Sequence, residues 1–165
     1  MAAPVEPLTN ADTLAELYRR HANALLATAY RLLLSRADAE DVVHDLFIGL
    51  PAALLKYEER GSMESWLKRI TVRLALTRLR KRRHVPLEEF DDLAVVTADP
   101  VNRVAIQRAL ATLSPALRAV LVLKELEGFS HAEIASMLGI SIAASEVRLH
   151  RALRQLRAAL SEEGR

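Results

Sequence analysis

Cysteine is absent from the 165 residues, which excludes disulfides, thiol catalysis and thiolate metal sites and suits a reducing, cytoplasmic setting. Aromatic residues make up only 4% of a chain that is 51% hydrophobic, as expected for an all-α fold rather than a sheet-built core. Five glycines leave little scope for a glycine-rich phosphate loop. No apolar run approaches the ~18 residues of a membrane span, and no secretory signal begins the chain, so we expect no direct membrane insertion.

Charge is strongly segregated along the chain, although the net charge is only +2. Residues 1–60 hold six basic and nine acidic side chains, and residues 61–84 hold eight and one. Residues 85–100 hold five acidic side chains and none that is basic, whereas residues 101–165 hold nine basic and six acidic ones. Such segregation predicts different partners for different blocks.

The basic block at 61–84 combines its cations with apolar residues at helical spacing. Gly61 and Ser62 break the chain before it, and an amphipathic helix with one core side should follow. So much like charge on one helix is self-repulsive unless a polyanion neutralises it, and nucleic acid is the usual polyanion. A solvated basic face is the alternative. The apolar positions are Trp66, Leu67, Ile70, Leu74 and Leu76.

Two further helices are predicted before the basic block. Thr9 or Asn10 can cap the first, which should run to about Ser35. Asp38 is the expected N-cap of the second, and Pro51 should end or kink it. After the basic block, residues 84–100 are acidic, bounded by proline and aperiodic, so we expect a linker. This linker divides the chain into domains at 1–83 and 101–165.

The C-terminal block carries clear helix boundaries. Proline follows a cap residue at Asp99-Pro100 and at Ser114-Pro115, which predicts helices at about 101–112 and 115–127. Ser130 and Glu133 then form a capping box at the start of a short helix.

Gly139 should end this short helix, and Ser141 should cap a longer one with arginines on its exposed side. A short helix, a glycine turn and a longer basic helix form the helix-turn-helix plan of DNA-binding proteins. An ordinary helical hairpin is the alternative.

Taken together, these blocks resemble the extracytoplasmic-function, or group IV, sigma factors of bacterial RNA polymerase. The resemblance covers about residues 12–160. Residues 38–47 resemble region 2.2 of that family, residues 66–83 resemble regions 2.3 and 2.4, and residues 109–157 resemble region 4. It implies a protein that binds core polymerase and directs promoter-specific initiation, recognising −10 and −35 elements and helping to open DNA. It implies neither catalysis nor a cofactor or metal.

The resemblance assigns polymerase binding to one face of the second helix. Core RNA polymerase would present its β′ clamp helices to this face, and its β flap elsewhere. Helix-capping carboxylates alone would also explain the acidic residues. The residues concerned are Asp38, Glu40, Asp41, His44 and Asp45.

The resemblance also assigns −10 promoter DNA to residues 57–83, where a loop would hold a flipped base and cations would grip phosphates. Trp66 can be a stacking platform, although its place in the apolar stripe favours the core. Arg73 and Thr77 stand where the family commonly has asparagine and aspartate, so its −10 sequence preference is not carried over. The candidates are Tyr57, Arg60, Ser62, Trp66, Lys68, Arg69, Arg73, Thr77, Arg80, Lys81 and Arg82.

The resemblance also assigns contact with the −35 element to the last helix and to the segment before the helix-turn-helix. Arginine there can read guanine bidentately. Glu146 would either repel the DNA or accept from a cytosine amine, which predicts weak or unusual −35 recognition. The candidates are Lys124, Ser141, Ala144, Glu146, Arg148, His150 and Arg151.

Four further hypotheses concern partners and alternatives. An anti-sigma factor would control the protein, with tethering at the membrane through that partner left open. The acidic linker, with Glu88, Glu89, Asp91 and Asp92, would shield the basic helix from non-specific DNA. A stand-alone helix-turn-helix regulator leaves residues 38–83 unexplained, and an enzyme would have only the i,i+4 pair Glu40 and His44 as metal ligands.

Overall fold

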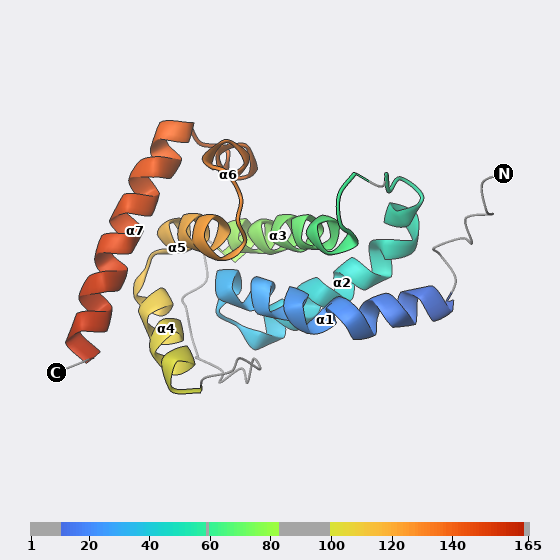
Figure 1. Cartoon of the computed structure of the whole chain (residues 1–165), viewed down its shortest axis with the longest axis horizontal. Helices are drawn as coiled ribbons and strands as arrows, with labels where there is room; N and C mark the ends of the chain where they lie inside the picture. The colour runs from blue at the N-terminus through green and yellow to red at the C-terminus, as the bar shows by residue number, and fades with distance from the viewer. Residues whose placement is uncertain (1–10, 59, 83–99, 164–165) are drawn as a thin grey trace.

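A computed structural model describes residues 11–58, 60–82 and 100–163. Within these ranges the chain is helical and contains no strand, which confirms the predicted all-α fold (Figure 1). None of the described helices is both long and apolar enough to cross a bilayer. The helices are α1 (Ala11–Leu33), α2 (Arg36–Leu54), α3 (Met63–Lys81), α4 (Pro100–Thr112), α5 (Pro115–Leu121), α6 (His131–Leu138) and α7 (Ile142–Glu163), with a π-helical turn η2 (Val122–Leu126) after α5.

The N-terminal unit consists of α1, α2 and α3, which pack against one another. Helix α1 ends at Leu33, where Leu34 adopts a left-handed conformation with a φ of 50°. The N-cap of α2 is Ser35 and not Asp38 as predicted, since the Ser35 hydroxyl accepts from the Asp38 amide at 3.3 Å. Asp38 therefore lies in the first turn, where the helix dipole favours its charge.

Pro51 does not end α2, which continues to Leu54. Helix α3 begins as predicted, because the Ser62 hydroxyl accepts from the Ser65 amide at 3.1 Å. Its apolar residues serve two cores. Leu67 is buried with half-buried Trp66, and Val72 is buried on the other side of the helix.

The C-terminal unit consists of α4 to α7, and its predicted caps from Ser114 onward are confirmed, whereas the predicted cap Asp99 lies outside the described residues. Ser114 caps α5, with Pro115 in the first turn. Ser130 and Glu133 form the capping box of α6, and Gly139 ends that helix in the left-handed conformation. Ser141 starts α7 by accepting from the Ala144 amide at 3.0 Å.

The predicted helix at 115–127 is interrupted. Helix α5 ends at Leu121, and a π turn follows in which the Glu127 amide donates to the Val122 carbonyl at 3.0 Å. Residues 118–123 are all buried, because α5 packs against both α7 and α1. A regular one-sided helix would leave part of such a run exposed.

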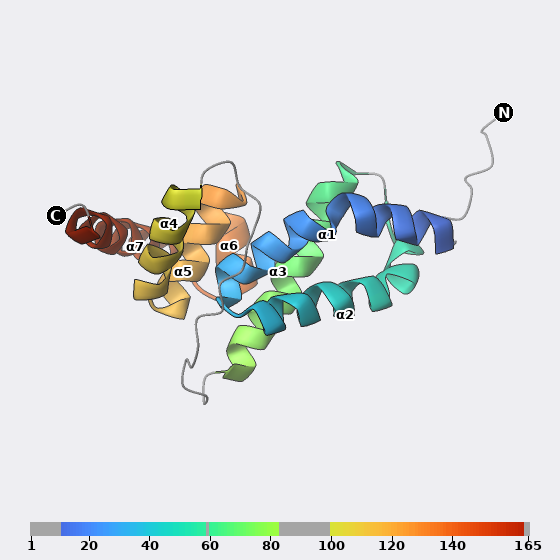
Figure 2. The ribbon, with the colours of Figure 1, turned by 90° about the horizontal axis from the view of Figure 1, so that it is seen from below.

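The two units share one hydrophobic core. Leu33 and Val72 of the N-terminal unit cluster with Val120 and Ile134 of the C-terminal unit. Figures 1 and 2 show α5 and α6 beside α3 and the end of α1. A second core lies within the N-terminal unit and combines Leu25 of α1 with residues of α2 and α3. The predicted linker lies outside the described residues, except for Pro100 at the start of α4.

Candidate polymerase and nucleic-acid surfaces

The acidic residues of α2 lie on a face that also meets α3. Arg78 of α3 contacts three of them, with distances of 3.2 Å to Asp38, 3.1 Å to Asp41 and 3.6 Å to Asp45. Arg82 pairs with Asp38 as well. The predicted acidic face is therefore partly neutralised within the N-terminal unit.

Two other predicted contacts on α2 are exposed. The Glu40 carboxylate pairs with Arg36 at 2.8 Å, one turn earlier, and His44 faces solvent. Farther along the same helix, Ile48 is 66% exposed although it is a large apolar residue. Helix α2 therefore presents charged side chains followed by an apolar one, a mixture that suits a protein partner.

The aromatic candidates near the start of α3 pack on each other. The rings of Tyr57 and Trp66 lie 4.8 Å apart at 55°, and both border the core of the N-terminal unit. This packing favours the core interpretation of Trp66. In the preceding loop, Arg60 pairs with Glu58 at 2.9 Å, and the Ser62 hydroxyl is engaged as the helix cap.

Several predicted −10 cations of α3 contact the C-terminal unit. Arg69 pairs with Glu133 at 3.0 Å, and Arg80 donates to the Met137 carbonyl at 2.7 Å. Arg82 turns to the end of α1, donating to the Leu33 carbonyl at 2.8 Å. Burial lowers the pKa of the Arg82 guanidinium.

The remaining predicted positions on α3 are exposed. Arg73 and Lys81 have no ion-pair partner within the described ranges of the chain. The Thr77 hydroxyl donates to the Arg73 carbonyl at 2.9 Å, inside the helix. These three −10 candidates are therefore accessible to a polyanion.

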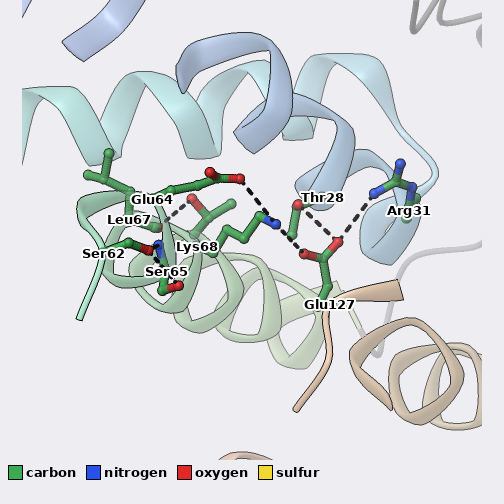
Figure 3. A network of polar contacts seen from close by, with 9 residues as sticks. Thr28, Arg31, Ser62, Glu64, Ser65, Leu67, Lys68 and Glu127 are labelled. Atoms are coloured by element: carbon green, nitrogen blue, oxygen red, sulfur yellow. Dashed lines mark hydrogen bonds and ion pairs between the residues drawn. The ribbon is translucent and has the colours of Figure 1, made fainter. Parts of the chain in front are cut away.

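Lys68, which is also a predicted −10 cation of α3, joins a buried polar cluster around Glu127 (Figure 3). The Glu127 side chain is 1% exposed and lies just after the π turn. Its carboxylate accepts from the Thr28 hydroxyl at 3.0 Å and from Arg31 at 3.2 Å, and its other oxygen lies 3.7 Å from the Lys68 ammonium. Lys68 also pairs with Glu64 at 3.5 Å.

Arg118 forms a second buried polar contact between the two units. It is 1% exposed and donates to the Leu32 carbonyl at 3.3 Å and to the Leu113 carbonyl at 3.2 Å. Its remaining nitrogen, Nη2, has no hydrogen-bond partner among the residues described. Burial, and then the charge of Arg82, lowers the pKa of Arg118 to about 10, so the side chain remains charged at neutral pH.

The helix-turn-helix is held together by a contact between its two helices. His131 Nδ1 lies 2.8 Å from the hydroxyl of Ser145, which is fully buried at the start of α7. Glu146, His150 and Arg154 follow at i,i+4 spacing on the opposite, exposed face. His150 Nε2 lies 3.1 Å from Arg154 Nη2.

The other −35 candidates differ in their exposure. Arg151 is exposed and Arg148 half-buried, and neither has an ion-pair partner within the described residues. Ser141 and Ala144 form the first turn of α7 through their capping hydrogen bond. Lys124 is half-buried in the π turn.

No local pattern in the sequence marks the interface residues Thr28, Arg31, Glu127 and Arg118. These residues are 86 to 99 positions from the partners that define their roles, so neither periodicity nor local motifs point to them. By its sequence context, Glu127 is an ordinary charged residue at the end of a predicted helix. No group of three or more potential metal ligands occurs in the described parts of the chain, so Glu40 and His44 have no third ligand there.

Comparison with known proteins gives matches over both units. Residues 17–85 match sigma-70 region 2, and residues 103–156 match sigma-70 region 4. The ECF RNA polymerase sigma factor SigE of Mycolicibacterium smegmatis is 36% identical over 86% of this chain, which spans 59% of SigE. SigM of Mycobacterium tuberculosis, also an ECF RNA polymerase sigma factor, is 32% identical over 86% of this chain and 74% of SigM.

A solved structure resembles the whole arrangement. It is the sigma factor RpoE of Bartonella quintana in complex with the anti-sigma factor NepR. The TM-score is 0.70 at 25% identity, and the match covers 91% of this chain and 97% of RpoE.

Proposed function

Because the chain belongs to the extracytoplasmic-function sigma factors, we propose that it binds core RNA polymerase and directs initiation at a specific set of promoters. The observation that carries this proposal is the presence of both family regions, in order, within one chain. In this role the protein is a transcription initiation factor without a reaction of its own.

Polymerase binding is assigned to the outer face of α2. Asp41 and Asp45 supply exposed carboxylates and Ile48 an apolar contact, next to the exposed His44. The proposed partners are the β′ clamp helices for this face and the β flap for the C-terminal unit. Both carboxylates share Arg78, so binding to the clamp competes with an ion pair inside the protein.

Promoter DNA is assigned to the two basic helices. Helix α3, in the domain 1–83, engages the −10 element through its cations, and the exposed face of α7, in the domain 101–165, engages the −35 element. Residues 84–100 connect these domains. Glu146, on the DNA-facing side of α7, sets −35 preference together with Arg151.

Control by an anti-sigma factor is the last part of the proposal. The likeness to RpoE extends over 97% of that chain, and RpoE is seen in complex with NepR. A partner that holds the two units together would keep both DNA surfaces from acting at once on one promoter. The acidic stretch at 84–100 would add to this control by shielding α3.

In vitro transcription with purified core polymerase across a genomic promoter library tests the function. Added protein should produce initiation at a discrete promoter set. Tight core binding without initiation would contradict promoter recognition, and absence of core binding would favour a stand-alone DNA-binding regulator.

A paired variant tests the polymerase surface. Asp45→Asn should weaken core binding about three- to fivefold, the size expected for one exposed charge contact. Glu16→Gln is the matched control, because Glu16 is equally exposed but lies on α1, where it pairs with Arg19 and Arg20. Equal core binding by the two variants would contradict the assignment of α2.

A further inference from the structure

We propose that the segment 127–137 imitates −10 DNA and occupies the phosphate-binding side chains of α3 while the protein is free of polymerase. This proposal rests on the proposed function, because it assumes that α3 binds DNA. The segment begins at Glu127, at the end of the π turn, and runs through the capping box into α6. The protein therefore holds itself in a closed state without any partner.

Glu127 is the centre of this contact. All of its side-chain partners belong to the N-terminal unit, namely Thr28 and Arg31 of α1 and Lys68 of α3 (Figure 3). Its side chain is 1% exposed, although carboxylates are seldom buried without compensation. Since the hydrogen-bond and ion-pair partners of this side chain among the described residues all lie in the N-terminal unit, its burial serves the association of the two units.

The chemistry of the Glu127 site is that of a phosphate site. One hydroxyl and two cations surround an oxyanion, and hydroxyl, lysine and arginine donors are the groups that bind phosphate oxygens in protein–DNA complexes. Lys68 is itself a predicted −10 contact, and the Glu127 oxygen lies 3.7 Å from it. The carboxylate therefore occupies the −10 candidate Lys68 in the way that a phosphodiester would, whereas Thr28 and Arg31 hold the carboxylate in the closed state.

The rest of the segment continues the imitation along α3. Glu133 pairs with Arg69 at 3.0 Å, and the guanidinium of Arg69 lies 5.9 Å from the ring centre of Phe129. The Met137 carbonyl accepts from Arg80 at 2.7 Å. The segment thus offers a carboxylate, an aromatic ring and a carbonyl oxygen to the side chains that would meet phosphate and base.

Occupation of these side chains has a quantitative consequence. When only a fraction of molecules is open, the apparent affinity for DNA falls in proportion to that fraction. Weakening the closed state raises DNA affinity until nearly all molecules are open. Glu127→Gln removes the charge but keeps the shape, so it should weaken the closed state without disturbing either unit.

The absence of cysteine makes the closed state easy to measure. Asn23→Cys on α1 and Gln155→Cys on α7, both exposed, accept a pair of dyes for energy transfer. We expect Glu127→Gln to lower the transfer efficiency of the protein alone. It should also raise affinity for a labelled random-sequence single-stranded oligonucleotide about tenfold. Glu125→Gln is the matched control, because it removes the same charge from an exposed position two residues away.

A second variant changes the partner of Glu127 on α1. Thr28→Val removes the hydroxyl that donates to Glu127 and keeps the side-chain volume, and Thr28 is not among the proposed DNA contacts. It should shift transfer efficiency and DNA affinity in the same direction as Glu127→Gln. Transfer efficiency and affinity that remain at wild-type values in both variants would overturn the proposal. So would lower transfer efficiency without a gain in DNA affinity.

Transcription separates this outcome from a failure of the proposed function. If wild-type protein and Glu127→Gln both support initiation with core polymerase but show equal DNA affinity alone, only the imitation of DNA is rejected. If neither supports initiation nor binds core polymerase, the proposed function itself is rejected.

Discussion

Helices α3 and α7 are both rich in arginine, yet their cations are used differently. On α3, Lys68, Arg69 and Arg80 all contact the C-terminal unit. On α7, Arg151 is exposed and has no ion-pair partner among the described residues. The number of cations on a helix therefore indicates that the helix can bind a polyanion. The packing of the helix decides whether those cations are free to do so.

The difference arises from the position of each helix. Helix α7 packs one face on α4, α5 and α6 and leaves its other face open. Helix α3 packs on α1 and α2, and α5 and α6 lie beside it (Figure 2). Of the two proposed DNA surfaces, one is consequently open in the free protein, and the other is partly covered by the protein itself.

Removal of Arg118 should have the largest effect on the covering of α3, because this side chain joins the two units. Arg118→Ala deletes two hydrogen bonds to buried carbonyls and leaves a cavity, which should lower the free energy of unfolding by about 3 kcal/mol. Urea unfolding followed by circular dichroism measures this loss. Arg108→Ala, at an exposed position of α4, should change stability by less than about 0.5 kcal/mol. Equal effects of the two substitutions would show that Arg118 does not join the units.

A pair of arginine variants compares the contributions of α7 and α3 to DNA binding. Arg151→Ala should reduce the affinity of the protein alone for duplex DNA about tenfold, because this side chain is available. Arg80→Ala should reduce it less in the protein alone, and more in complex with core polymerase, if polymerase binding opens the proposed closed state. Fluorescence anisotropy measures the affinity in both settings. Losses of equal size in the free protein would contradict the coverage of α3.

Reversal of the charge at Glu146 tests whether the exposed face of α7 meets DNA. Glu146→Arg should raise DNA affinity several-fold and steepen the dependence of log K on log salt by about one unit, since a repulsive charge becomes a phosphate contact. Footprinting should show altered −35 preference. Unchanged affinity, salt slope and preference would place Glu146 away from the DNA.

Glu133 should give the smallest effect. The backbone hydrogen bond from Ser130, with the Ser130 hydroxyl and Arg69, lowers the pKa of the Glu133 carboxyl. Its folded pKa thus lies below the unfolded value of about 4.3. The stability it contributes is complete above the unfolded pKa and is lost as pH falls through the folded pKa.

Solvent screening limits this contribution to less than about 1 kcal/mol, because the side chain is 40% exposed. The free energies of unfolding of wild type and Glu133→Gln should converge as pH falls from 5 to 3. Parallel curves would contradict this role.

Local signals in the sequence predicted the helices well. Caps such as Ser62 and Ser141, and the left-handed Gly139, act within one turn and are visible as short motifs. Ser35 rather than Asp38 caps α2, directly after the left-handed Leu34, and the apolar pattern around Leu34 gives no sign of this turn.

The contacts between the units could not be predicted in the same way. Glu127 and Thr28 are 99 residues apart, and their contact depends on how two cores merge. The π turn is equally hidden, because its residues are as apolar as those of an ordinary helix. The predicted DNA and polymerase contacts remain predictions. Their helices are confirmed, and the variants above address their roles.

The π turn at Val122–Leu126 makes the relation between the two halves depend on the number of residues as well as on their kind. The π turn winds its five residues through about the angle that four residues cover in an α-helix, so it holds one extra residue. Rewound as an ordinary α-helix, the same residues would rotate everything after them by about 100°. Glu127 would then face away from α1, with every amino acid that contacts it unchanged. The winding of this turn, as well as its side chains, therefore decides whether the closed state can form.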